Sequence, residues 1–150
     1  MRYLFWVMVI VSTFILQRIL SVSGVVPNFT LLLVYYAGLR EGSSTGILFG
    51  SLIGSIEDSL SGTFLGPYLL SKGMVGYLSS FMSGSFFRWT PLSGAIGVAS
   101  FTILDSLIVL ASRSFFDRIP VSTLSALLII FIQTLFNTPL GIFITPKNKD

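Results

Sequence analysis

Hydrophobic and polar positions follow one another along this chain in long blocks rather than in single alternations. Six largely uncharged apolar runs are separated by short breaks that carry charges, glycine or proline. Most runs approach the roughly 20 helical residues that cross about 30 Å of hydrocarbon. The pattern therefore predicts an all-α polytopic membrane protein, a six-transmembrane-helix bundle. The predicted spans are 3–20, 29–39, 42–60, 68–87, 92–111 and 121–144.

Three of these runs have features of their own. The second has only about 11 residues, so we expect it to tilt, to extend through Val25 and Val26, or to insert in part. Pro139 should kink the last turns of the sixth run. The first run follows Arg2 and resembles a signal peptide. Because five more apolar segments follow it, we expect it to remain as an uncleaved first span.

Composition strengthens the membrane interpretation and narrows the chemistry. The chain is 53% hydrophobic and 10% charged, with a mean hydropathy of +0.88, which is far from the composition of a soluble domain. We expect one helical bundle domain over residues 1–150. Cysteine and histidine are absent, so disulfides, the usual zinc ligands and Ser-His-Asp catalysis are excluded. No enzyme activity and no cofactor are predicted.

Basic residues predict the orientation in the membrane. The net charge of +3 is small and the basic residues are scattered, which argues against a nucleic-acid surface. Cytoplasmic loops carry the excess of Lys and Arg. With six spans, one side would hold five basic residues and the other three, so both termini are predicted in the cytoplasm. The five are Arg2, Arg40, Arg88, Lys147 and Lys149, and the three are Arg18, Arg113 and Arg118.

Four glycines recur at intervals of four residues in the third run. Gly42, Gly46, Gly50 and Gly54 would lie on one helix face and leave a groove without side chains, where another backbone can approach closely. The sequence leaves open whether this face packs within the bundle, against a second copy or against a partner's helix.

Arg18 near the end of the first span can reach the interface, which leaves four charged residues in the other predicted spans as candidates for a site: Glu57, Asp58, Lys72 and Asp105. A charge at mid-bilayer costs about 2.5 to 3.5 kcal/mol on insertion scales, so each should have a partner or a wet cavity. An ion pair between Asp58 and Lys72 would join consecutive spans. With both termini inside, Asp105 would approach the same outer side as Asp58, which would form a convergent polar pocket.

Two other hypotheses for these carboxylates, intramembrane proteolysis and proton transport, have less support in the sequence than an ion pair or a polar pocket. Intramembrane aspartyl proteases carry a Gly-x-Gly-Asp element, whereas Asp58 follows Ser55-Ile56-Glu57. A proton relay through Glu57, Asp58 and Asp105 is physically allowed in a transporter, but the chain lacks histidine and shows no clear pair of broken helices.

Several motifs in residues 27–84 occur together in an order that resembles a known family. They are the run Pro-Asn-Phe-Thr-Leu-Leu-Leu-Val-Tyr-Tyr-Ala-Gly-Leu from Pro27, the glycine series with Asp58, the segment Ser61-Gly62-Thr63-Phe64-Leu65-Gly66, and Gly76-Tyr77. Together they resemble the rod shape-determining protein MreD family. The residues on the family pattern are Pro27, Asn28, Gly42, Gly46, Gly50, Gly54, Asp58, Gly62 and Gly66, whereas Lys72 and Asp105 match no motif of the family.

The resemblance implies a non-enzymatic inner-membrane component of the machinery that elongates the bacterial cell wall. Its implied partners are the single-span protein MreC, a SEDS-type glycan polymerase, a penicillin-binding transpeptidase and an actin-like filament protein. The leading hypothesis is a scaffold that binds MreC and helps to position the peptidoglycan synthases. The family is also similar in fold to the substrate-binding subunits of energy-coupling-factor transporters. The alternative is therefore a small-molecule or lipid-binding transport subunit, with a pocket at Asp58, Asp105 and the 61–66 loop.

Overall fold

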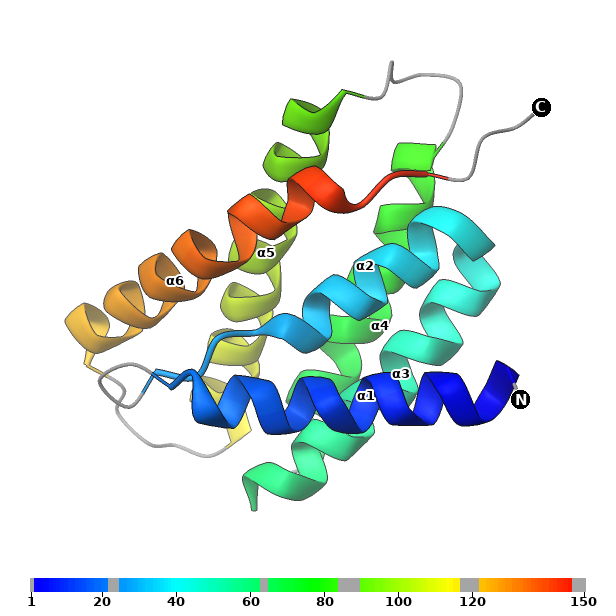
Figure 1. Cartoon of the computed structure of the whole chain (residues 1–150). Helices are drawn as coiled ribbons and strands as arrows, with labels where there is room; N and C mark the ends of the chain where they lie inside the picture. The colour runs from blue at the N-terminus through cyan, green and yellow to red at the C-terminus, as the bar shows by residue number, and fades with distance from the viewer. Residues whose placement is uncertain (1, 22–24, 63–64, 84–89, 117–121, 147–150) are drawn as a thin grey trace.

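Helices form the framework of the computed structural model, which describes residues 2–21, 25–62, 65–83, 90–116 and 122–146 (Figure 1). In these residues six α-helices and two short 3-10 helices follow one another, so the all-α prediction is confirmed. They are α1 (Arg2–Ile19), α2 (Phe29–Glu41), α3 (Ser43–Ser61), α4 (Pro67–Ser79), η1 (Ser80–Ser83), α5 (Pro91–Phe116), α6 (Thr123–Asn137) and η2 (Thr138–Phe143).

The helices differ in whether they can cross a membrane unaided. Among the described residues, two segments are long and apolar enough: Pro91–Phe116, with 26 residues, and Leu124–Phe143, with 20. Leu4–Ile19 is apolar but shorter, and α2 and α4 have 13 residues each. A 13-residue helix is about 20 Å long. The prediction of six membrane-spanning helices is therefore not confirmed by helix length and hydropathy.

Local sequence signals explain where these helices begin and end. The side chain of Asn28 accepts a hydrogen bond from the backbone N–H of Leu31 and caps the start of α2. Gly42, at φ +92°, separates α2 from α3, and Gly62 ends α3 in the left-handed conformation that glycine adopts without strain. Pro67 occupies the first turn of α4, where its missing N–H costs nothing.

Pro139 has the effect that the sequence predicts. The regular turns of α6 stop at Asn137, and the chain continues through the proline as the 3-10 helix η2. This helix packs closely on α5, since a Cβ at Gly141 would lie 2.7 Å from the carbonyl oxygen of Gly94. The sixth predicted segment is thus one bent unit.

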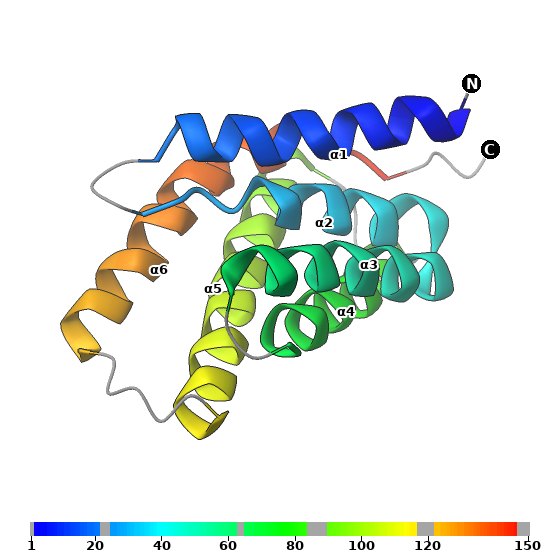
Figure 2. The same cartoon turned by 90° about the horizontal axis from the view of Figure 1, so that it is seen from below.

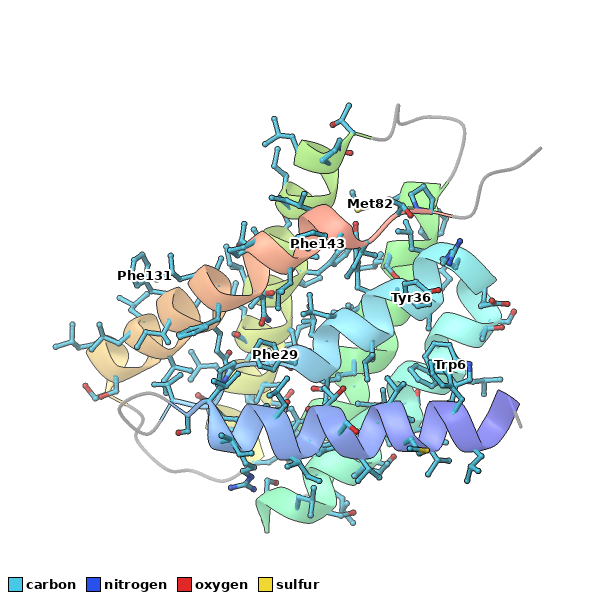
Figure 3. The ribbon with its side chains drawn as sticks, in the orientation of Figure 1. Trp6, Phe29, Tyr36, Met82, Phe131 and Phe143 are labelled. Carbon is cyan, nitrogen blue, oxygen red and sulfur yellow. The ribbon has the colours of Figure 1, made fainter. Side chains whose placement is uncertain are left out.

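The elements form two groups in space. Helices α2, α3 and α4 pack against one another and α1 packs on α2, whereas α5 packs on α4 and contacts α6 and η2 (Figures 1 and 2). Buried aliphatic and aromatic side chains fill the space between them, and they are Leu31, Val34, Ile53 and Val75 in one cluster and Tyr35, Leu39 and Val98 in another. Figure 3 shows Trp6 of α1 directed toward Tyr36 of α2, with 6.1 Å between ring centroids.

The glycine series packs inside the bundle rather than on its surface. A Cβ at Gly46, Gly50 or Gly54 would collide with a backbone carbonyl of α4. Those carbonyls belong to Gly76, Lys72 and Tyr68, respectively, which are also spaced by four residues. Gly42 differs, because it lies in the turn before α3 and nothing approaches its Cβ position within 4 Å. Three of the four glycines therefore form the groove, and α4 occupies it.

Candidate functional site

A buried lysine holds three helices together at the centre of the molecule. Lys72 of α4 is fully buried, and its Nζ lies 2.9 Å from Oε2 of Glu57 on α3 and 3.3 Å from Oδ2 of Asp105 on α5. The side chain of Glu57 is 10% exposed and that of Asp105 is 1% exposed. We call these three residues the charged triad. Each helix contributes one charge, so the triad fixes the register of α3, α4 and α5.

The start of α2 supplies a polar hub for the triad. Asn28 Oδ1 accepts a hydrogen bond from Lys72 Nζ at 3.1 Å, and its Nδ2 donates to Asp105 Oδ2 at 2.5 Å. The same Oδ1 also caps the helix through Leu31. Asparagine is suited to this position because its amide both donates and accepts. One side chain thus connects the first turn of α2 to the triad.

Two hydroxyl groups complete the hydrogen bonding of the carboxylates. Thr30 donates to Oε1 of Glu57, and Ser71 donates to Oδ1 of Asp105 at 2.5 Å. Thr30 and Ser71 are both fully buried. Buried charges are tolerated when they are paired and their remaining oxygens are hydrogen-bonded, and the triad meets both conditions.

The triad carries one more negative charge than positive charge when all its members are ionised. Removing one partner from such a cluster leaves a buried unpaired charge, which typically costs 3 to 5 kcal/mol. The arrangement therefore has a strong structural role, and it also leaves an uncompensated negative charge for which a further cation or a proton would be the natural partner.

Asp58 has a different role from the one that the sequence suggests. Its carboxylate accepts hydrogen bonds from the backbone N–H groups of Gly66, Tyr68 and Leu69, at 2.9, 3.1 and 3.0 Å. A carboxylate at the start of a helix satisfies free N–H groups and favours the positive end of the helix dipole. The predicted ion pair between Asp58 and Lys72 is wrong, because Asp58 caps the first turn of α4 while Lys72 lies further along that helix.

The predicted 61–66 loop is described only in part, because residues 63 and 64 lie outside the described residues. Gly62 is the left-handed residue that ends α3, and Gly66, at φ +142°, precedes α4 and donates its N–H to Asp58. Both glycines therefore serve the backbone of the turn. They bring the end of α3 to the start of α4.

Two clefts, of about 160 Å³ each, border the triad and share one wall. The wall is formed by Asn28, Tyr68 and Gln133, which line both. The first, the α1–α3 cleft, is lined among others by Phe14, Gln17, Arg18, Glu57, Leu60 and Ser61. The second, the α5–α6 cleft, is lined among others by Asp105, Ser106, Val109, Arg113, Ala126 and Ile130.

This arrangement differs from the single pocket expected for Asp58 and Asp105. Glu57 borders the α1–α3 cleft and Asp105 the α5–α6 cleft, whereas Asp58 is absent from both linings. The ring of Tyr68 lies within cation-π distance of Lys72 Nζ, at 5.5 Å, and of Arg113 Cζ, at 5.3 Å. Tyr68 therefore links the triad to the basic residue of the second cleft.

Polar side chains of α6 hold the non-helical residues before α2, a role that the sequence did not assign. Gln133 Nε2 donates to the carbonyl of Val26 at 3.0 Å, and Asn137 Nδ2 donates to the carbonyl of Asn28 at 3.0 Å. The available signal was the presence of two carboxamides in an otherwise apolar run. Their backbone partners lie more than 100 residues away in sequence, so no local pattern identifies them.

Comparison with known families gives one finding. The family model described as rod shape-determining protein MreD matches residues 1–144 of this chain. Comparisons with curated proteins and with solved structures gave no match.

Proposed function

The chain belongs to the rod shape-determining protein MreD family of bacterial membrane proteins, and we propose that it acts as a non-enzymatic scaffold in cell-wall elongation. Membership supports a role in rod-shape determination. The observation that carries the proposal is the family match over nearly the whole chain. The finer steps, binding of a single-span MreC-like protein and positioning of a glycan polymerase, a transpeptidase and actin-like filaments, are part of the proposal.

The packing of the bundle supports a scaffold role. The charged triad pairs α4 with α3 and α5, and the glycine groove brings the backbones of α3 and α4 into close contact. We propose that residues 1–150 act as one rigid domain in the cytoplasmic membrane, with both termini in the cytoplasm. Such a body can present a fixed surface to a partner's transmembrane helix.

The partner's helix has to meet a face other than the glycine groove, because α4 occupies that groove. Large apolar side chains face outward on α1 and α6, among them Leu4 at 66%, Met8 at 62%, Phe131 at 65% and Leu135 at 60% exposure. Figure 3 shows Phe131 on the outer side of α6. We propose that one of these two faces receives the partner and that lipid covers the other.

Affinity purification from the native membrane tests this proposal. The tagged protein is extracted in mild detergent, and bound proteins are identified by mass spectrometry. We expect a single-span wall-elongation protein in stoichiometric amount. Two double variants then identify the face: Leu4→Ala/Met8→Ala on α1 and Phe131→Ala/Leu135→Ala on α6. Because a single span docks on one face, we expect one double variant to lose the partner, and the other then serves as its control. Absence of such a partner from a folded preparation would contradict the scaffold role.

The two clefts support the alternative of a transport subunit, because a substrate-binding subunit needs a cavity near one membrane face. That alternative requires a small ligand that co-purifies with the protein in stoichiometric amount. The same preparation is therefore analysed for small molecules. A soluble metabolite without any protein partner would favour the transport subunit over the scaffold.

A further inference from the structure

The α1–α3 cleft contains a buried polar side chain that the scaffold role does not use. Gln17 of α1 is only 7% exposed and lines the cleft, yet its carboxamide oxygen is buried without a hydrogen-bond partner among the described residues. A buried carboxamide without a partner is costly, by about 1 to 3 kcal/mol for each unsatisfied polar group. Rotation of the amide can present either its oxygen or its nitrogen to a bound group. A ligand in the cleft could therefore supply the hydrogen-bond partner that Gln17 lacks.

The charges around this cleft are separated in space. Glu57 lies at its inner end and belongs to the triad, in which negative charge exceeds positive charge. Arg18 lies at the rim, is exposed, and forms no ion pair in the part of the chain that the structure describes. A ligand that matches this pattern carries a cation with hydrogen-bond donors inside and an anion at the rim.

The walls of the cleft are apolar on the remaining sides. Phe14, Val26 and Leu60 contribute them. The neighbouring outward face of α1 is also apolar, with Ile15 at 55% and Ile19 at 72% exposure. The volume of about 160 Å³ is roughly ten times the 10 to 15 Å³ that one water needs. The cleft therefore suits a polar group attached to hydrocarbon rather than a single ordered water.

We propose that the α1–α3 cleft binds the headgroup of an aminophospholipid of the phosphatidylethanolamine type. Its primary ammonium points to Glu57 and Gln17, its phosphate pairs with Arg18, and its acyl chains lie along α1. The ammonium supplies the positive charge that the triad lacks. Arginine suits the phosphate because its guanidinium donates to two oxygens at once. This inference assigns the α1 face to lipid, which leaves the α6 face for the proposed protein partner.

A series of lipids with graded headgroup chemistry tests the proposal without any mutation. Detergent-purified, delipidated protein is titrated with phosphatidylethanolamine, its trimethylated analogue phosphatidylcholine, and phosphatidylglycerol, all with the same acyl chains, and bound lipid is counted by native mass spectrometry. We expect phosphatidylethanolamine to bind about tenfold more tightly than the other two, because only its ammonium combines a positive charge with hydrogen-bond donors at the inner end. Equal binding of all three would overturn the proposal.

Two arginine variants then locate the site. Arg18→Gln removes the rim charge from an exposed position, whereas Arg113→Gln makes the same change in the α5–α6 cleft. We expect Arg18→Gln to weaken phosphatidylethanolamine binding about tenfold and Arg113→Gln to leave it unchanged. The opposite ranking, or equal effects of both variants, would overturn the assignment to the α1–α3 cleft.

The source of the ligand is tested with the headgroup alone. Aminoethyl phosphate carries the same ammonium and phosphate without acyl chains. We expect it to compete with the lipid only at concentrations at least a hundredfold higher, since it loses the apolar contacts. If it binds as tightly as the lipid does, the ligand is a soluble zwitterion and the lipid assignment is wrong.

Discussion

Lys72 is the residue on which most of the internal polar contacts converge. It is fully buried and pairs with Glu57 and Asp105, while Asn28 accepts its remaining hydrogen bond. An ammonium in this position attracts two carboxylates that would otherwise repel each other in a low-dielectric interior. The stability of the bundle should therefore depend on this one side chain more than on any surface charge.

Replacing Lys72 with methionine tests that dependence. Lys72→Met keeps most of the volume but leaves two buried carboxylates without their cation, so we expect a loss of about 3 to 5 kcal/mol in the free energy of unfolding. Denaturant unfolding in detergent, followed by tryptophan fluorescence, measures it. The exposed Arg18→Gln is the matched control and should change stability by less than about 1 kcal/mol.

A charge-neutral triple variant separates lost charge balance from lost packing. Lys72→Met combined with Glu57→Gln and Asp105→Asn removes every charge of the triad and keeps the carboxamide oxygens as acceptors. We expect it to recover a large part of the stability lost in Lys72→Met, because no ion then remains buried and unpaired. A triple variant no more stable than Lys72→Met would show that packing, not charge, sets the cost.

Asp58 offers a second prediction, since its contacts are to the backbone. Asp58→Ala removes the acceptor for three N–H groups at the start of α4, and we expect a loss of about 2 kcal/mol. Asp58→Asn keeps one acceptor oxygen and should lose less. Hydrogen exchange should show faster exchange confined to the first turn of α4 in Asp58→Ala. Uniformly faster exchange along the chain would contradict the capping role.

At the scale of elements, the contact between α3 and α4 depends on the absence of side chains. Gly50→Ala places a methyl group against the carbonyl of Lys72, so we expect the two helices to separate and the free energy of unfolding to fall by about 1 to 3 kcal/mol. Gly73→Ala makes the same change on α4, where the nearest atom is Ser51 Oγ at 3.0 Å, and should cost little because that side chain can rotate.

The same pair of variants distinguishes internal packing from partner binding. Both are compared for folded yield and for recovery of the co-purifying partner per folded molecule. We expect Gly50→Ala to lower the yield and to leave the partner ratio unchanged, because the glycine face meets α4 and not another protein. A normal yield with a reduced partner ratio would instead place the partner in the groove.

Local signals in the sequence predict the elements well, and the long-range pairings poorly. Pro139 is predicted where the structure changes from α6 to η2, because proline acts on its own backbone. The break before the third run is displaced by one or two residues, since the sequence predicts it at Arg40-Glu41 and it lies at Gly42. Asp58 and Glu57 are adjacent, and hydropathy cannot say which of them turns toward Lys72. That choice depends on the packing of α3 on α4 and on the crossing of α5, which bring Asp105 to within 3.3 Å of Lys72.

The whole molecule raises the question of how short helices take part in crossing a membrane. Helix α2 is about 20 Å long, and the four non-helical residues 25–28 before it can add at most about 13 Å. Non-helical backbone is tolerated at membrane depth where protein satisfies its polar groups. Gln133 and Asn137 do so for the carbonyls of Val26 and Asn28. We therefore retain six crossings as a proposal, with the second completed by this held segment.

Because the chain contains no cysteine, single introduced thiols can report its topology directly. Ser59→Cys lies at the exposed end of α3 and Glu41→Cys at the exposed end of α2, so the two positions bracket α3. With six crossings and cytoplasmic termini, a membrane-impermeant maleimide should label Ser59→Cys in intact cells and Glu41→Cys only after permeabilisation. Labelling of both from outside would mean that α3 does not cross, and the reverse pattern would place the termini on the outer side. The first outcome puts the α1–α3 cleft, which Leu60 and Ser61 line, at the outer leaflet, where its proposed lipid would have to be present, whereas the reverse pattern puts it at the inner leaflet.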